Sequence, residues 1–275
     1  MSGLSRTFAR LKERNEGALV AYVTAGDPDL SYTPEIVEAL VEGGADVIEL
    51  GIPFSDPIAD GPIIQAASAR ALKTGTTPRK VLKTIDKMKD SNRIPIVAMT
   101  YYNPIFRMPL KNFFESARAC GVDGVVVPDL SIEEADEYKK LAEAYDVDTI
   151  FLAAPSTSID RLGKILKYSS GFLYLVSVFG VTGIRENMEH QTVKLIRKTL
   201  RSTRGKMPLS VGFGISKPEH VQTVISNGAD AAIVGSGFVK IIERNRKNNE
   251  GKMLRELEDC ARQLKKATKN EQNAN

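Results

Sequence analysis

The chain has 275 residues, of which 42% are hydrophobic and 26% are charged, and its formal net charge is +4. This balance is typical of a globular protein that needs no disulfide or metal to hold its core, and the charge is too small and too scattered to indicate a nucleic-acid partner. No apolar run reaches 18 residues, which argues against a membrane-spanning helix, and the two cysteines, Cys120 and Cys260, show no ligand spacing.

The first residues of the chain predict a short helix rather than a secretion signal. Residues 1–18 lack the apolar segment of a signal peptide, and Leu4, Phe8 and Leu11 are spaced to form one apolar face. We expect this helix to cover one end of the core. The absence of a signal and the cysteine usage both suit a cytoplasmic protein.

Eight apolar runs follow, and amphipathic stretches with helical spacing separate them. Continuous runs rich in valine and isoleucine are typical of parallel strands that are buried on both faces. Eight such units predict a (β/α)8 barrel, that is, a TIM barrel, with an extra N-terminal helix. A doubly wound open sheet is the alternative, but the turn TAGDPD after the first run lacks the glycine fingerprint of a dinucleotide site. The runs lie at residues 18–26, 46–53, 94–103, 124–130, 148–155, 171–178, 208–215 and 231–238.

We assign residues 1–267 to a single barrel domain and residues 268–275 to a polar C-terminal tail. Within the domain, the segments GGADVIEL, CGVDGVVVP and NGADAAIVG share one pattern, in which a glycine ends a helix and an aspartate precedes a strand. This pattern is a weak internal repeat of helix-to-strand turns, and it supports the repeated βα organisation.

Glycine-rich segments follow the sixth, seventh and eighth runs. GVTG occupies residues 180–183, GFGIS residues 212–216 and GSGF residues 235–238. Glycines let backbone N–H groups approach an anion closely, and barrels often bind phosphate in the loops after strands seven and eight. These loops therefore predict a phosphate site, to which Ser236 would add a hydroxyl donor.

The second run, DVIELGIP, places Glu49 inside an apolar strand, and no lysine or arginine occurs within the eight runs to pair with it. A desolvated carboxyl group has a raised pKa that suits proton transfer near neutral pH. Asp60 lies on the loop just after the same strand, so it is expected to face the same pocket. Two carboxylates in different environments can divide proton transfer and charge stabilisation between them. Asp56 lies on the same loop, in a Ser-Asp-Pro context that is also a common turn.

Several enzyme classes are disfavoured. The two histidines, His190 and His220, lie in helical stretches, so neither a Ser/His/Asp triad nor a metal site is predicted. No strand ends on a lysine, which argues against Schiff-base chemistry. Tyr22, Tyr102 and Tyr174 would either pack the barrel core or form flat walls for an aromatic group. The residues thus predict a cofactor-free barrel enzyme that applies carboxylate acid–base catalysis to a phosphorylated substrate with an apolar part.

In order and spacing, the chain resembles the α subunit of tryptophan synthase over about residues 1–265, through VIELGIPFSDPIADGPIIQ, GVVVPDL, GVTG, GFGIS and GSGFVKIIE. The resemblance implies retro-aldol cleavage of indole-3-glycerol phosphate to indole and glyceraldehyde 3-phosphate, with no metal or cofactor in this chain. It makes Glu49 the acid/base that protonates indole C3 and Asp60 the group that stabilises the charged indolenine. Tyr22 replaces the phenylalanine of many relatives, so its hydroxyl needs a partner when buried. The implied substrate-binding residues are Tyr22, Tyr102, Val127, Leu152, Tyr174, Thr182, Gly183, Gly214, Gly235 and Ser236.

The same resemblance implies a partner protein. The family works as an α2β2 complex, in which indole passes through a tunnel to a β subunit that carries pyridoxal phosphate. Pro53, Asp56 and Asn103 match partner-contact positions, and Thr182 is expected to reach Asp60 when the site closes. Two rival interpretations stay open from the sequence: another phosphate-binding barrel lyase or prenyltransferase, and a non-catalytic subunit that only activates its partner.

Overall fold

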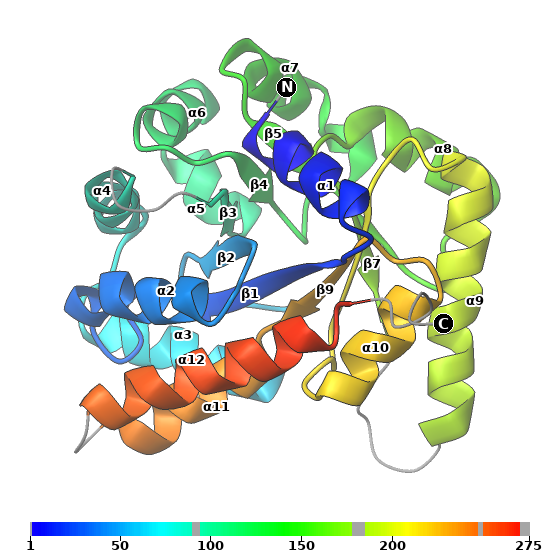
Figure 1. Cartoon of the computed structure of the whole chain (residues 1–275). Coiled ribbons are helices and arrows are strands. Elements are labelled where there is room, and N and C mark those ends of the chain that lie inside the picture. The colour runs from blue at the N-terminus through cyan, green and yellow to red at the C-terminus, as the bar shows by residue number, and fades with distance from the viewer. Residues whose placement is uncertain (1, 90–93, 178–184, 247–249, 270–275) are drawn as a thin grey trace.

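The computed structural model describes residues 2–89, 94–177, 185–246 and 250–269, and for 185–189 it describes the backbone alone. Strands alternate with helices along the chain, and the helices surround a ring of strands (Figure 1). No helix within these ranges combines the length and the apolar character needed to cross a membrane.

The strands are β1 (Ala18–Thr24), β2 (Val47–Gly51), β3 (Ile96–Met99), β4 (Gly124–Val126), β5 (Asp148–Ile150), β6 (Leu152–Ala153), β7 (Leu173–Val176), β8 (Leu209–Gly212) and β9 (Ala231–Val234). The helices are α1 (Gly3–Glu13), η1 (Leu30–Tyr32), α2 (Thr33–Glu42), α3 (Pro62–Lys73), α4 (Pro78–Met88), α5 (Tyr102–Arg107), α6 (Leu110–Ala119), η2 (Ile132–Glu134), α7 (Asp136–Ala144), α8 (Ile159–Tyr168), α9 (Arg185–Thr203), α10 (Pro218–Ser226), α11 (Ser236–Asn245) and α12 (Glu250–Lys266).

All paired strands are parallel, and their order around the ring is β5-β4-β3-β2-β1-β9-β8-β7-β6. The fifth predicted run forms two short strands, β5 and β6, which Phe151 separates. β5 pairs with β4, whereas β6 pairs with β7, and the Tyr174 N–H donates to the Phe151 carbonyl over 3.1 Å. The two edges of the sheet are therefore consecutive parts of one segment, and the barrel is nearly closed. The predicted (β/α)8 barrel is confirmed, with its fifth strand divided where the segment changes neighbours.

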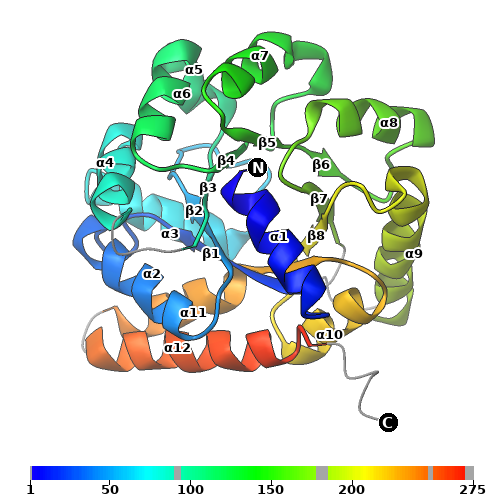
Figure 2. The same ribbon diagram turned by 45° about the horizontal axis from the view of Figure 1, so that its top comes forward.

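The extra N-terminal helix is confirmed as α1. Ser2 caps it, since its hydroxyl oxygen accepts a hydrogen bond from the backbone N–H three residues further on. Leu4, Phe8 and Leu11 are buried as predicted, and the Phe8 ring lies 5.8 Å from the ring of Phe172, which directly precedes β7. Figure 2 shows α1 lying across the ring of strands. The helix thus covers the N-terminal ends of the strands and leaves their C-terminal ends open.

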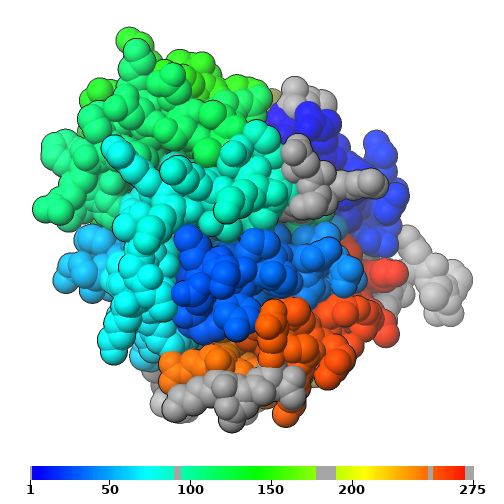
Figure 3. Space-filling view, turned by 90° about the vertical axis from the view of Figure 1, so that its left-hand side faces the viewer, coloured from blue at the N-terminus to red at the C-terminus, as the bar shows by residue number. Residues whose placement is uncertain are grey.

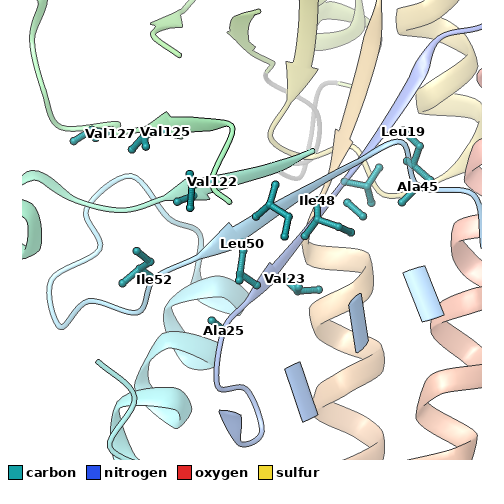
Figure 4. Packing of buried hydrophobic residues seen from close by; sticks show 14 of the residues in the cluster. Leu19, Val23, Ala25, Ala45, Ile48, Leu50, Ile52, Val122, Val125 and Val127 are labelled. Atoms are coloured by element: carbon teal, nitrogen blue, oxygen red, sulfur yellow. The ribbon is translucent and has the colours of Figure 1, made fainter. Parts of the chain in front are cut away.

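Side chains alternate between the two faces of each strand and form two apolar clusters. The outer cluster lies between the strands and the helices, and Figure 4 shows part of it, including Ile48 and Leu50. The inner cluster fills the barrel and includes Tyr22, which lies opposite Glu49 in the β1–β2 register. Because Glu49 stands between two outward-facing neighbours, its side chain points into the barrel.

The helix-to-strand repeat has a structural basis. In each copy, the aspartate precedes a strand, and its carboxylate accepts a hydrogen bond from a backbone N–H near the start of the neighbouring strand. This contact fixes one strand against the next at the N-terminal end of the barrel, the end opposite to the one where barrel enzymes place their chemistry, so the repeat serves stability. The bonds join Asp46 to Leu19 (2.9 Å), Asp123 to Ile96 (3.1 Å) and Asp230 to Leu209 (2.8 Å).

The C-terminal helix α12 is tied to this same end of the barrel. It packs beside α2, as the side view in Figure 3 shows. Lys265 Nζ lies 2.8 Å from Asp46 Oδ2 and 3.0 Å from the Gly17 carbonyl oxygen. The Gly17 N–H donates to the carbonyl of Thr268, which is buried. The packed chain therefore extends past the predicted domain boundary at residue 267, and the rest of the predicted tail, 270–275, lies outside the described residues.

Replacing Lys265 with methionine is expected to lower the free energy of unfolding by about 2 kcal/mol, because Asp46 would lose its counter-ion while it stays largely buried. Lys266→Met is the matched control, since Lys266 is an exposed lysine at the next position of the same helix, and a change of less than about 0.5 kcal/mol is expected there. Urea unfolding of both variants tests this; equal stabilities would show that the ion pair contributes nothing.

Candidate active site

A cavity of about 470 Å³ opens at the C-terminal ends of the strands, and this volume lies within the range of small-molecule sites. It brings together many of the predicted site residues, namely Tyr22, Glu49, Asp60, Tyr174, Gly214, Gly235 and Ser236. The remaining lining residues are Gly61, Pro62, Ile63, Ile64, Met99, Ser177, Phe213, Ile215 and Ile233, and the sequence prediction did not name them as site residues.

Glu49 is the most deeply buried acid of the cavity, with 1% of its surface exposed. Neither of its carboxylate oxygens has a hydrogen-bond partner among the described residues, and no lysine or arginine there forms an ion pair with it. Burial raises the pKa of Glu49 to about 8, and the nearby charge of Asp60 adds to the rise. Glu49 therefore carries a proton at neutral pH and can release it to a bound molecule.

Asp60 lies on the loop between β2 and α3 and is half-buried. Burial raises the pKa of Asp60 to about 6, and a hydrogen bond with Tyr101 opposes part of the rise. At neutral pH Asp60 is therefore mostly ionised while Glu49 is mostly protonated. Two carboxyl groups whose environments separate their pKa values in this way can act as an acid and a charge stabiliser in one site.

Tyr101 holds the loop that carries Asp60. Its hydroxyl accepts a hydrogen bond from the Ala59 N–H over 3.0 Å, and its ring lies 5.4 Å from the ring of Phe54 on the same loop. The sequence prediction named Tyr102 instead. The signal that would have found Tyr101 is its place two residues after the end of β3, at the end of the barrel where sites form.

The walls of the cavity are largely apolar. The Tyr174 and Phe213 rings meet edge to face with centroids 5.7 Å apart. The Tyr22 hydroxyl finds the partner that its burial requires, because its oxygen lies 3.3 Å from Thr24 Oγ1. Such walls suit a flat aromatic group. Strand parity would have identified Met99 and Ile233 as wall residues, since both occupy inward-facing positions.

Gly214, Gly235 and Ser236 form what we call the anion cradle. Gly235 precedes the N-terminus of α11, and Ser236 begins that helix, where unpaired N–H groups and the helix dipole favour a negative charge. A Cβ atom on Gly235 would lie 2.9 Å from Cδ1 of Tyr22, so only glycine fits beside this ring. The cradle has the backbone donors and the close approach that a phosphate group requires.

Other predicted substrate residues lie elsewhere. Tyr102 begins α5 and packs with the outer cluster, and Val127 belongs to that cluster as well (Figure 4), because Val126 takes the inward position on β4. Leu152 contacts the inner cluster, but together with Val127 it lines a second cavity of about 380 Å³. Val127 follows the last residue of β4, and its predicted contact with substrate stays a prediction. Thr182 and Gly183 lie outside the described residues.

Two of the predicted partner-contact residues, Pro53 and Asp56, lie on the loop after β2, and the third, Asn103, lies in α5. Pro53 is buried, whereas Asp56 and Asn103 are exposed. Two large apolar side chains of the same segments are also exposed, Ile58 on the loop after β2 by 79% and Phe106 in α5 by 68%. Within the described residues, no group of three or more His, Cys, Asp or Glu side chains is arranged to hold a metal ion.

A parallel barrel whose open cavity lies at the C-terminal ends of its strands and is lined by two carboxyl groups has the architecture of a (β/α)8-barrel enzyme. The family model described as tryptophan synthase alpha chain matches residues 8–269. The chain therefore belongs to the tryptophan synthase alpha chain family, which makes it a lyase.

Individual relatives agree with this assignment. The tryptophan synthase alpha chain of Solibacter usitatus is 46% identical over 97% of this chain and 98% of its own, and that of Methanosarcina barkeri is 48% identical over 97% of each. The crystal structure of tryptophan synthase subunit alpha from Legionella pneumophila superposes with a TM-score of 0.86 at 34% identity, and 98% of each chain is covered. A chain of the tryptophan synthase complex from Pyrococcus furiosus gives a TM-score of 0.81 at 41% identity, and covers 91% of this chain and 98% of its own.

Proposed function

We propose that this chain cleaves indole-3-glycerol phosphate to indole and glyceraldehyde 3-phosphate, a step of tryptophan biosynthesis. The observation that carries the proposal is Glu49, a buried carboxyl group without a hydrogen-bond partner that faces the open cavity beside Asp60. An unpaired buried acid opposes folding, so a chain that keeps one at the catalytic end of a barrel needs it for chemistry. The particular reaction is inferred from the membership of the chain in the tryptophan synthase alpha chain family.

The cavity supports this substrate at both of its ends. The phosphate group binds at the anion cradle, where backbone N–H groups and the α11 dipole stabilise its charge. The indole ring lies among the apolar walls, with Asp60 and Glu49 at its edge. Tyr174 and Phe213 flank the ring with flat surfaces. This arrangement holds the bond that breaks close to Glu49, which contributes to the rate through orientation.

Proton transfer by Glu49 drives the reaction. Its carboxyl group, protonated at neutral pH, gives its proton to C3 of the indole ring, which becomes tetrahedral, and the ring nitrogen takes the positive charge of an indolenine. The Glu49 carboxylate then removes the proton from the glycerol hydroxyl on the carbon attached to C3. The bond between C3 and that carbon breaks, its electron pair returns to the ring and neutralises the nitrogen, and an aldehyde and indole are released. Glu49 is then protonated again.

Asp60 stabilises the charged intermediate. It is mostly ionised at neutral pH and accepts a hydrogen bond from the indole N–H, so its negative charge offsets the positive charge that develops on the ring. Tyr101 holds the Asp60 loop before substrate arrives, which lowers the reorganisation needed during the reaction. The contact between Thr182 and Asp60 upon closure stays a prediction.

Indole release from indole-3-glycerol phosphate tests the proposal, measured for the purified chain with and without a tryptophan synthase β subunit. We expect release by the chain alone and a higher rate with the β subunit. A subunit that only activates its partner would release no indole in either condition, although it would still stimulate the β subunit. Another phosphate-binding lyase or a prenyltransferase would leave indole-3-glycerol phosphate intact, and that result would contradict the proposal.

The partner we propose is a β subunit that carries the pyridoxal phosphate, in an α2β2 complex that receives indole in the cytoplasm. The Pyrococcus furiosus relative was solved as part of a tryptophan synthase complex. On this chain, the loops after β2 and β3 contact each other through Ala59 and Tyr101. The first loop exposes Ile58, and α5, which follows the second loop, exposes Phe106. Large exposed apolar side chains at the rim of a site are typical of a protein–protein contact.

Ile58→Asp is expected to raise the Kd for a β subunit at least about tenfold, because a charge would be buried in the interface without a counter-ion. Ile159→Asp is the matched control, since Ile159 is the first residue of α8, outside these segments, and is 66% exposed. Titration of β-subunit activation with each variant measures both affinities. Equal affinities of the two variants would place the contact surface elsewhere.

A further inference from the structure

Ser177, the residue directly after β7, contacts two successive carbonyl groups of the neighbouring segment. Its backbone N–H donates to the Gly212 carbonyl over 2.8 Å, which continues the β7–β8 pairing by one residue. Its hydroxyl donates to the next carbonyl along the chain, that of Phe213. Ser177 is 5% exposed and lines the cavity. No step of the proposed reaction uses it.

The segment that Ser177 holds has an unusual backbone. Phe213 has a φ of +66° and Gly214 a φ of +77°. Glycine adopts this left-handed region freely, whereas a bulky residue such as phenylalanine does so only where its surroundings compensate the strain. Two contacts compensate it here: the Ser177 hydroxyl on the Phe213 carbonyl, and the packing of the Phe213 ring against Tyr174 at 5.7 Å. Strained residues of this kind are common in binding sites, where they hold the backbone in the conformation that the ligand requires.

The direction of one carbonyl decides the direction of the next N–H. In a trans peptide unit the C=O and N–H groups point to opposite sides. The Phe213 carbonyl points toward Ser177, which belongs to the β7 side of β8, so the Gly214 N–H points toward the β9 side. Gly235 and Ser236 follow β9. Among the described residues, no backbone carbonyl accepts a hydrogen bond from the Gly214 N–H, so this donor is available to a bound anion.

We propose that Ser177 is a positioning residue for the phosphate group of the substrate: its hydroxyl holds the left-handed turn at Phe213–Gly214 and thereby directs the Gly214 N–H into the anion cradle. The inference rests on the proposed function, because the phosphate of the substrate is the ligand of the cradle. It adds a residue that touches no substrate atom but determines how tightly the phosphate end is bound.

Ser177→Ala tests the inference, with inorganic phosphate as the probe in isothermal titration calorimetry and indole-3-glycerol phosphate in the activity assay. We expect the Kd for phosphate and the KM to rise about five- to tenfold, the effect of one lost hydrogen bond, while kcat changes less than about threefold. Ser177→Thr keeps the hydroxyl and is expected to stay within about twofold of the wild type in both measurements. Ser177→Cys, which keeps the size but has only a weak S–H donor, replaces the alanine variant should that variant not fold.

Ser169→Ala is the matched control. The Ser169 hydroxyl is also buried and also donates to a backbone carbonyl, that of Ile165 at 2.9 Å, but it lies at the end of α8 and does not line the cavity. We expect a comparable loss of stability in thermal unfolding and unchanged phosphate affinity. A Ser177→Ala protein that binds phosphate within about twofold of an active wild type would overturn this inference alone. A wild type that neither binds phosphate nor releases indole would overturn the proposed function and this inference with it.

Discussion

Glu49→Gln is expected to lower kcat for indole release by about 10²–10⁴-fold, the usual contribution of a general acid–base group, while substrate affinity changes little. Glutamine keeps the shape of the side chain but has no acidic proton to give to indole C3 and no carboxylate to receive the hydroxyl proton. Glu38→Gln on α2 is the matched control, because it makes the same chemical change at an exposed position away from the cavity. Equal turnover by the Glu49 variant and the wild type would refute the role of Glu49.

The pH dependence provides a second readout of the same assignment. The proposed reaction requires Asp60 to be ionised and Glu49 to be protonated in the free enzyme, and their pKa values are about 6 and about 8. We therefore expect kcat/KM of the wild type to rise through about pH 6 and to fall through about pH 8. In Asp60→Asn the acid limb should disappear and the residual activity should keep the alkaline limb. An unchanged acid limb would assign it to another group.

Glu49→Gln is also expected to stabilise the fold, and increasingly so as the pH rises. The pKa of Glu49 is about 8 in the folded protein and 4.5 in an exposed side chain. Between these values the folded protein keeps a proton that the unfolded chain has released. This proton therefore contributes its full stabilisation below pH 4.5. The free energy of unfolding then falls as the pH rises from 4.5 to about 8, by up to about 5 kcal/mol in total. Glutamine does not titrate, so the Glu49→Gln variant does not lose stability in this way as the pH rises.

Urea unfolding at pH 5, 7 and 9 measures this difference. The free energy of unfolding of Glu49→Gln should exceed that of the wild type by a margin that grows over this range, whereas Glu38→Gln should follow the wild type throughout. A margin that is constant with pH would mean that Glu49 ionises normally in the fold. The predicted effects on turnover and on stability together describe a trade-off, in which the residue that opposes folding is the one to which we assign the chemistry.

The order of the elements could be predicted from the sequence because it depends on local pattern. The apolar runs became strands and the helical spacing of Leu4, Phe8 and Leu11 became α1, since period and composition act within each segment. The division of the fifth strand at Phe151 could not be predicted, because it arises where one segment changes neighbours to close the ring. The contact of Lys265 with Asp46 joins residues that are 219 positions apart, and no local pattern reports such a pair.

The candidate site shows the same division. Glu49, Asp60 and the glycines of the cradle could be named from residue type and position after a strand, and the structure places them around one cavity. The cavity is also lined by Met99 and Phe213. Phe213 has a positive φ, a backbone conformation that phenylalanine rarely adopts, so its place in the wall could not be predicted from the sequence. Tyr101 and Tyr102 are adjacent residues of the same type, and only the tertiary structure shows which of them contacts the Asp60 loop.

The sequence by itself determined which chemical groups this protein has and at which end of the barrel they lie, because the C-terminal ends of parallel strands meet at one face. The tertiary structure alone decided how these groups behave. Glu49 and Asp60 are ordinary carboxyl groups in the chain, and they acquire pKa values of about 8 and about 6 only because the closed ring removes water from one more completely than from the other. Desolvation depends on every element around a group, so no stretch of sequence specifies it.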